Sequence, residues 1–336
     1  MSVLEILEAG PYTSVQDRGR FGGQRYGLGT AGAMDVFALA MANALVGNTP
    51  ERAAIEIGPL PVKFRVAMGA MRIALAGAAR GVSVNGRALV PLETALLGEG
   101  DVVQVRGCSA GVFSYLALEG GIRAEPKFGS LSMHARSGIG SPYPRGLQGG
   151  DRIEAGEASA RQVERAMLAP VRPAGPLRVV LGPQDDHFSQ ETIDTFLAAE
   201  WVISKTSDRM GFRLEGPVLA HARGHNIISD GIANGAIQIP GNGQPLVLLA
   251  DRGTTGGYPK IATIISADLG RLAQTPAGAG IRFTKVSVAE AQAEARRVHG
   301  VMAGLRDHVH DIGGGDLSSE FLLAANLAGG AINAFE

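Results

Sequence analysis

One short segment of the sequence carries most of the side chains that could do chemistry. Between Asp251 and Lys260 lie carboxylate, guanidinium, hydroxyl, phenol and ammonium groups, which supply donors, acceptors and two cations. Glycine-rich turns occur at 240–245 and 253–259, and their backbone N–H groups can converge on an anionic or carbonyl oxygen. The segment therefore predicts an oxygen-binding corner, with an ordinary hairpin as the competing interpretation.

A second group of charged residues lies upstream. Arg209 and Arg213 stand on either side of a glycine in the string SDRMGFR. Two guanidinium groups so placed suit bidentate binding of a carboxylate or a phosphate. A solvated loop with a charge pair explains the same residues without a ligand, so both interpretations stay open.

Other motifs favour structural interpretations. The string GLGTAG at 27–32 matches the G-x-G-x-x-G dinucleotide pattern, but a buried strand should precede it and residues 21–26 are polar and glycine-rich. A turn that caps the following helix is favoured. His308 and His310 could ligate a metal, but the surrounding composition is typical of a solvated tail, so no metal site is expected. Cys108, the only cysteine, excludes intrachain disulfides and multi-cysteine metal sites.

The elements that must position these groups are mainly β with a few helices. Short apolar runs alternate with Gly, Pro and Asn-Gly turns, and Asn85-Gly86 predicts a two-residue type I′ hairpin. The clearest helix covers residues 33–46, and residues 158–168 also have helical spacing.

The domain organisation follows from a proline-rich stretch at 169–176, a composition typical of a junction. We predict an N-terminal β-rich domain over residues 1–170 and a second β-barrel domain over 177–306 that ends in a helix. A tail of unknown role covers residues 307–336.

Composition narrows the class of partner. The chain has 336 residues, with 31 Lys and Arg against 32 Asp and Glu, so its net charge of −1 provides no basic field for nucleic acid. The N-terminus lacks a signal-peptide pattern, and no apolar run reaches the roughly 18 residues of a membrane span. A cytoplasmic protein that binds neither nucleic acid nor membrane is expected.

Several strings resemble the family of the bacterial 5-oxoprolinase C component, called PxpC or KipA, which is similar to the second carboxyltransferase subdomain of urea carboxylase. They are SVQDRGR at 14–20, GAMD at 32–35, LALEGGI at 116–122, SDRMGFRLEGP at 207–217 and the segment 235–268. The resemblance spans about residues 3 to 290 and implies two β-barrel-like domains with cyclophilin-like topology.

The resemblance also implies a function. The chain would act in a heteromeric complex with the A component and a KipI-like B component of 5-oxoprolinase. This complex would convert 5-oxo-L-proline to L-glutamate, using ATP and Mg²⁺. A catalytic role is expected for Lys260, Thr255 and Asp251. Substrate binding is expected for Arg209, Arg213, Gln238, Gln244, Thr254 and Tyr258.

Two departures from the family pattern leave alternatives open. Asn242 replaces the usual Asp and Gly253 the usual Gln, so one charge and one amide are missing near the expected pocket. One alternative is a carboxyltransferase component that uses carboxybiotin, although the chain has no Met-Lys-Met biotin-acceptor string. The other is a KipA-like regulatory antagonist of a KipI-type kinase inhibitor.

Overall fold

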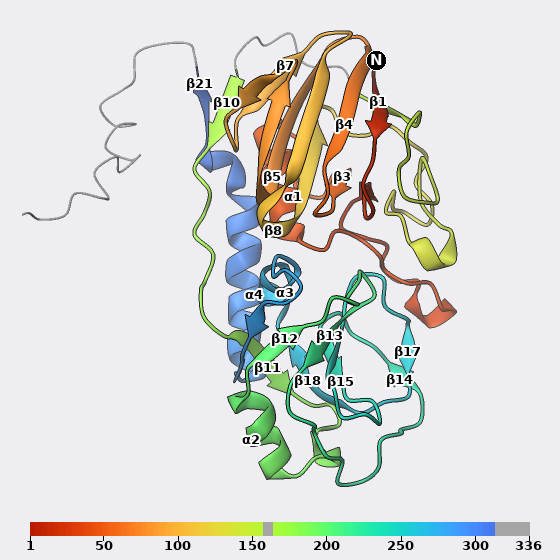
Figure 1. Cartoon of the computed structure of the whole chain (residues 1–336), viewed down its shortest axis with the longest axis vertical. Coiled ribbons are helices and arrows are strands. Elements are labelled where there is room, and N and C mark those ends of the chain that lie inside the picture. The colour runs from red at the N-terminus through yellow and green to blue at the C-terminus, as the bar shows by residue number, and fades with distance from the viewer. Residues whose placement is uncertain (157–163, 313–336) are drawn as a thin grey trace, which may run out of the picture.

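The computed structural model describes residues 1–156 and 164–312. Within these ranges the chain forms two barrel-like sheets, which lie one above the other in Figure 1, with helix α4 (Val288–Ala303) running beside both. The expected fold class, mainly β with a few helices and two barrel-like units, is confirmed. The strands of the first sheet all precede the proline-rich stretch 169–176, and those of the second all follow it.

The first sheet has long central strands. Its members among the described residues are β1 (Ser2–Glu8), β2 (Ser14–Gln16), β3 (Ala54–Ile57), β4 (Val62–Met68), β5 (Met71–Val84), β6 (Arg87–Leu89), β7 (Thr94–Leu97), β8 (Val102–Leu118) and β9 (Arg152–Ala155). β8, with 17 residues, pairs with β3, β4 and β5, which curves the sheet. The β5–β6 hairpin turns at Asn85 and Gly86, whose φ angles are 50° and 82°. The predicted type I′ turn is confirmed, because it requires positive φ at both residues.

The second sheet is nearly closed on itself. Its strands are β11 (Leu177–Leu181), β12 (Trp201–Ile203), β13 (Gly211–Glu215), β15 (Ala236–Gln238), β16 (Leu246–Leu248), β18 (Lys260–Ile264), β19 (Gly280–Ile281) and β20 (Phe283–Lys285). β19 and β20 form opposite edges, yet only Arg282 separates them in the chain. The two edges must therefore lie close together. A separate two-stranded ribbon pairs β14 (Asp230–Gly231) with β17 (Thr255–Gly256).

Helix α1 (Val36–Leu45) packs in the interface between the sheets, which we call the seam. The structure begins this helix at Val36 rather than 33, because Asp35 is its N-cap and accepts a hydrogen bond from Ala38 N at 3.1 Å. The side chains of 38–45 are all buried, and all but Asn43 share one hydrophobic cluster with residues of both sheets. The seam is therefore part of the core.

The remaining described helices are short apart from α4. They are α2 (Gln190–Ala198), α3 (Leu269–Ala273) and the 3₁₀ turns η1 (Gln24–Tyr26), η2 (Ala135–Ser137), η3 (Asp185–His187), η4 (Ser266–Asp268) and η5 (Leu305–His308). α4 starts with a Ser287–Glu290 capping box, which satisfies backbone donors at the helix start. In the described part of the chain, no helix has both the length and the apolar character needed to cross a membrane.

A strand pair outside the two sheets changes two expectations. β10 (Glu164–Met167) pairs with β21 (Val309–Ile312), so the helix predicted over 158–168 is wrong for its second half; the first half, 158–163, lies outside the described residues. Glu164 accepts a hydrogen bond from Leu96 N at 2.9 Å, and this contact with the first sheet overrides the helical spacing. Residues 307–312, expected in the tail, instead belong to η5 and β21, while 313–336 lie outside the described residues.

Candidate functional site

Lys260, the first residue of β18, is the centre of the predicted corner. Its side chain is 2% exposed, and Nζ donates to Asp230 Oδ2 at 2.8 Å. Gln184 completes a trio, because its Nε2 donates to the same Asp230 oxygen at 3.3 Å while its Oε1 accepts from Lys260 N at 3.1 Å. The Lys260 ammonium holds the pKa of the half-exposed Asp230 carboxyl below its ordinary value. Among the described residues, the ammonium has no hydrogen-bond partner besides Asp230.

The rim of this corner comes from the strands beside Lys260. Gln238 lies opposite Lys260 in the β15–β18 ladder and donates from Nε2 to Tyr258 O at 3.3 Å. A Cβ on Gly256 would stand 2.6 Å from Gln238 Nε2, so only glycine lets the amide lie there. Thr255 is exposed and Tyr258 is 39% exposed. Four of the predicted site residues thus lie on neighbouring segments: Lys260 and Gln238 are buried, and Thr255 and Tyr258 are exposed.

Gln244 is not in this corner, contrary to the prediction. The turn 240–245 begins beside the end of the turn 253–259, since Ile239 N donates to Pro259 O at 3.0 Å. Gln244 Oε1 accepts from Gly216 N at 3.0 Å and its Nε2 donates to Gly216 O at 3.1 Å. The amide is therefore occupied by a two-point bond to the backbone. Thr254 is half-buried, and its carbonyl accepts from Ile232 N at 3.1 Å.

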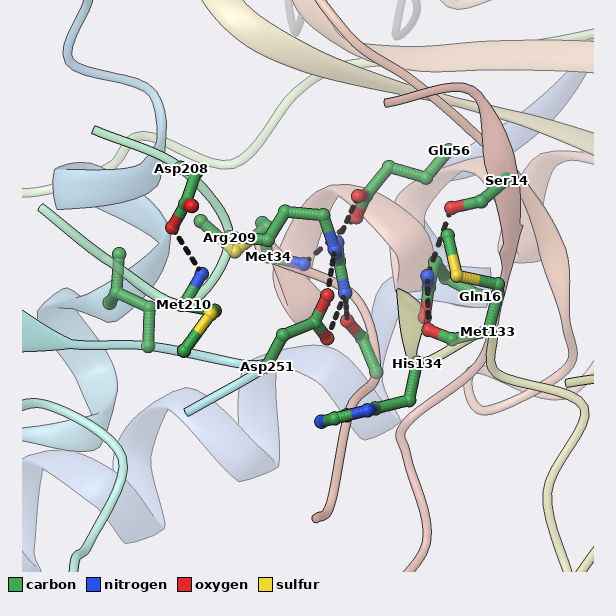
Figure 2. A network of polar contacts seen from close by, with 12 residues as sticks. Ser14, Gln16, Met34, Glu56, Met133, His134, Asp208, Arg209, Met210 and Asp251 are labelled. Atoms are coloured by element: carbon green, nitrogen blue, oxygen red, sulfur yellow. Dashed lines mark hydrogen bonds and ion pairs between the residues drawn. The ribbon is translucent and has the colours of Figure 1, made fainter. Parts of the chain in front are cut away.

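A buried ion network crosses the seam (Figure 2). Arg209, 4% exposed, donates through Nε and Nη2 to the two oxygens of Asp251 at 2.9 and 3.0 Å. Its Nη1 pairs with Glu56 of β3, and its Nη2 also donates to Gly32 O at 2.7 Å. One guanidinium therefore joins three segments that are distant in the sequence.

The charges in this network support one another. Burial raises the pKa of Glu56. The charge of Arg209 lowers this pKa, and so do the hydrogen bonds that Glu56 accepts from Met34 N at 2.9 Å and from the Tyr115 hydroxyl at 2.7 Å. Burial alone lowers the pKa of Arg209, but the charges of Glu56 and Asp251 outweigh burial and raise it. Three donors on Glu56 and two carboxylates on Arg209 thus satisfy the buried charges of the pair.

The predicted clamp of Arg209 with Arg213 is therefore wrong. All three guanidinium nitrogens of Arg209 are engaged within the protein, whereas Arg213 is exposed and its side chain forms no hydrogen bond or ion pair within the described ranges. Asp251 also has both oxygens bound to Arg209, so we replace its predicted catalytic role with a positioning role at the seam.

The G-x-G-x-x-G string is a turn and cap, as the sequence favours. η1 precedes Gly27, where a dinucleotide site needs a strand. Gly27 ends this turn with a φ of 78°, and Gly32 adopts a φ of 98° before the α1 cap. The motif therefore positions the Gly32 carbonyl on Arg209.

We expect Gly32→Ala to destabilise the protein markedly. Positive φ costs a residue with a Cβ about 1–2 kcal/mol, and the new Cβ would lie 2.8 Å from Arg18 O, adding about 1–3 kcal/mol of overpacking. Urea unfolding measures the loss. Gly150→Ala is the control, because Gly150 has a φ of 90° with nothing within 4 Å of its Cβ position. Equal losses for the two variants would contradict the steric argument.

The remaining candidates show no sign of chemistry. Among the described residues no group of three or more His, Cys, Asp or Glu side chains could hold a metal ion, and His308 and His310 lie in η5 and β21. Cys108 is partly buried, with Sγ 3.6 Å from Pro59 O.

Known proteins share both the sequence and the fold. A family model for the carboxyltransferase domain, subdomains A and B, matches residues 26–285. The chain belongs to this carboxyltransferase-domain family. Within it, the C component of the Escherichia coli 5-oxoprolinase is 38% identical over 86% of this chain and 93% of that protein. The Haemophilus influenzae protein of the same name is 33% identical with the same coverage.

A solved structure has a similar fold. The urea amidolyase of K. lactis superposes with a TM-score of 0.82 at 26% identity over 90% of this chain. This chain spans only 20% of that polypeptide. The similarity to the 5-oxoprolinase C component that the motifs indicated is confirmed, as is the relation to the urea-carboxylating enzymes.

Proposed function

We propose that this chain is the C component of an ATP-dependent 5-oxoprolinase, which opens 5-oxo-L-proline to L-glutamate together with the A and B components. The extent of the match carries the proposal, because the E. coli and H. influenzae C components align with this chain over 93% of their own length. The urea amidolyase shares only one part of a much longer polypeptide.

The chemistry defines what the complex must provide. A five-membered lactam is a stable amide, so its carbonyl oxygen must be activated before water can attack. Transfer of the terminal phosphoryl group of ATP to that oxygen releases ADP and makes the carbonyl carbon more electrophilic. One water then adds to this carbon and the C–N bond breaks, with the nitrogen leaving as the amine, which gives an acyl phosphate of glutamate. A second water hydrolyses the acyl phosphate to glutamate and phosphate. Donors around the oxygen stabilise the negative charge that develops on it. ATP with Mg²⁺ is assigned to the assembled complex rather than to this chain.

The corner around Lys260 has the donors for this task. The buried Lys260 ammonium and Gln238 amide lie on the paired strands β18 and β15, and the exposed Thr255 and the half-buried Thr254 lie on and beside β17, while Tyr258, which is also exposed, accepts a hydrogen bond from Gln238 through its carbonyl. A docked partner protein would cover the exposed residues and exclude water, which strengthens each hydrogen bond. Arg213 keeps its proposed role, as an exposed guanidinium for a carboxylate or a phosphate.

The family description favours a second candidate. A carboxyltransferase component would move CO₂ from carboxybiotin to urea or a related amide, and the similarity to urea amidolyase supports this reaction. It requires a biotinylated carrier and a biotin carboxylase. Activity that needs bicarbonate and is blocked by avidin would identify it.

We expect the isolated chain to be inactive and the complex reconstituted with the A and B components to release glutamate from 5-oxo-L-proline only with ATP. Coupled assays of glutamate and ADP measure both products, and the mixture without this chain is the control. Full turnover by the isolated chain would contradict the shared site. Tight binding to the B component without any turnover by the complete set would indicate a KipA-like regulatory protein instead.

A further inference from the structure

Three aromatic side chains on two loops are largely exposed to solvent. Phe21, Tyr26 and Phe128 are 71%, 76% and 70% exposed, whereas every other Phe and Tyr among the described residues is at most 42% exposed. Aromatic side chains are enriched, together with arginine, where proteins bind one another, and they supply many of the residues that dominate affinity. We call these three residues the aromatic patch.

One carboxylate connects the two loops. Asp17 Oδ1 accepts hydrogen bonds from Gly19 N and from Ser130 Oγ, each at 2.7 Å. Phe21 lies two residues after Gly19, and Phe128 lies two residues before Ser130. Both loops lie on the right-hand side of the molecule in Figure 1. The members of the aromatic patch therefore belong to loops that start from the same point of the fold.

The backbone of the first loop is fixed by its own hydrogen bonds, although the loop is exposed. Tyr26 N and Leu28 N both donate to Gly23 O, at 2.9 and 3.2 Å. The guanidinium of Arg25 lies 4.7 Å from the centre of the Tyr26 ring and stacks on it. A partner that binds here immobilises few additional groups, which reduces the entropic cost of association.

Phe128 occupies a turn position that disfavours a bulky side chain. Lys127 N donates to Ser130 O at 2.9 Å and Ser130 N donates to Lys127 O at 3.3 Å, so a two-residue turn joins them. Its central residues, Phe128 and Gly129, have φ angles of 53° and 77°, as in a type I′ turn, where Asn-Gly is strongly preferred. A bulky aromatic residue at positive φ is a rare outlier. Since the ring is exposed and packs little against the fold, the strain needs a reason outside the fold.

The first loop also borders the proposed corner. Gln24 Nε2 donates to Ile232 O at 3.4 Å, and Ile232 N donates to Thr254 O at 3.1 Å. The next residue along the chain is the exposed Thr255 of β17. A protein that covers the aromatic patch is therefore placed to cover this part of the corner as well.

Cations without partners surround the aromatic patch. Three exposed arginines on the two loops and the adjoining η2 have side chains that form no hydrogen bond or ion pair within the described ranges: Arg18, Arg25 and Arg136. The carboxylates of these loops are already engaged, Asp17 by the loop donors and Glu125 by Lys127 at 3.0 Å. The charge around the aromatic patch is therefore complementary to an acidic protein surface.

We propose that the aromatic patch is the docking site for a protein that presents apolar pockets rimmed by carboxylates, and that this protein is the B component. The aromatic rings fill the pockets and the unpaired arginines bind the carboxylates. The identity of the partner rests on the proposed function, because the B component belongs to the complex in which a docked protein covers the corner. The surface by which it binds is the new element.

Phe128→Asn tests docking separately from folding. Asparagine is the residue that a type I′ turn prefers, so the urea midpoint of this variant should stay the same or rise. Its affinity for the purified B component, measured by calorimetry, should fall about tenfold or more. Val218→Asn is the control, because Val218 is 71% exposed in the loop after β13 of the second barrel and should bind unchanged.

Charge reversal tests the electrostatic part of the proposal. Arg25→Glu combined with Arg136→Glu should weaken binding, and added NaCl should weaken binding of the original chain more than that of the double variant. Equal salt dependence of the two proteins would contradict an acidic partner surface. Analytical ultracentrifugation of the isolated chain tests a second copy as the occupant. A dimer that Phe128→Asn converts to a monomer would overturn the proposal.

The docking site and the proposed function can fail separately. If Phe128→Asn binds the B component with full affinity and supports full glutamate release, the docking site is wrong and the proposed function stands. If the B component binds through the aromatic patch but the complete complex releases no glutamate, the proposed function is wrong and the docking site stands. Absence of any binding between the original chain and the B component would also overturn the docking site.

Discussion

Replacing Lys260 with alanine should lower kcat for ATP-dependent glutamate release by the reconstituted complex by about 10²–10³. The ammonium is the formal positive charge of the proposed corner; its side chain is 2% exposed, and Asp230 is its only hydrogen-bond partner through Nζ among the described residues. Its loss removes stabilisation of the developing oxyanion, so kcat should fall more than KM rises. Steady-state assays with saturating ATP measure both parameters.

Lys285→Ala is the matched control for this variant. Lys285 lies on β20 of the same sheet and is exposed, so activity should not change. Circular dichroism and pull-down with the partner proteins verify that Lys260→Ala still folds and assembles. A folded, assembled Lys260→Ala complex with full activity would remove the corner from the mechanism.

Replacing Arg209 with methionine should cost about 3–5 kcal/mol of folding free energy. The change leaves Glu56 and Asp251 buried without their cation, and it also removes the donor to Gly32 O. Arg209→Lys should lose less, because it keeps one charge but not the planar fork that binds two carboxylates. Urea denaturation curves of the two variants measure the difference.

Arg213→Met controls for the loss of an arginine in the same region. Arg213 is exposed on β13, and its side chain has no described partner, so the free energy of unfolding should change by no more than about 0.5 kcal/mol. Equal effects at the two positions would show that the seam network contributes nothing to stability.

Local patterns in the sequence predict individual elements well. The turn at Asn85-Gly86 and the α4 helix depend on residues close together in the sequence, and both occur in the structure. The strand at Glu164–Met167 could not be predicted, because its partners, Leu96 and β21, are far away in the chain. Long-range pairing of this kind overrides local spacing.

In the candidate site, too, some contacts could be predicted from the sequence and others could not. Lys260, Gln238 and Tyr258 come together because their strands pair directly, which the sequence pattern of neighbouring strands indicates. Gln184 and Asp230 could not be predicted, since nothing in the sequence relates them to a lysine 76 and 30 residues away.

The burial of Glu56 could not be predicted from the sequence for a different reason. It stands between two isoleucines in β3, and such alternation ordinarily predicts a polar residue on the solvent side. Here the opposite face of β3 packs in the seam, so all four residues of the strand are buried. The same circumstance explains why the sequence predicts a ligand-binding role for Arg209: its two carboxylates come from different halves of the molecule.

The pairing of β10 with β21 makes the second barrel an insertion within the first unit. The polypeptide passes from one unit to the other twice, once through the proline-rich stretch 169–176 and once on its way back through α4. A single connection would permit one unit to rotate in any direction relative to the other. Two connections restrict this rotation to one hinge axis that passes through both connections. Any opening and closing of this protein during a catalytic cycle should therefore follow a single direction.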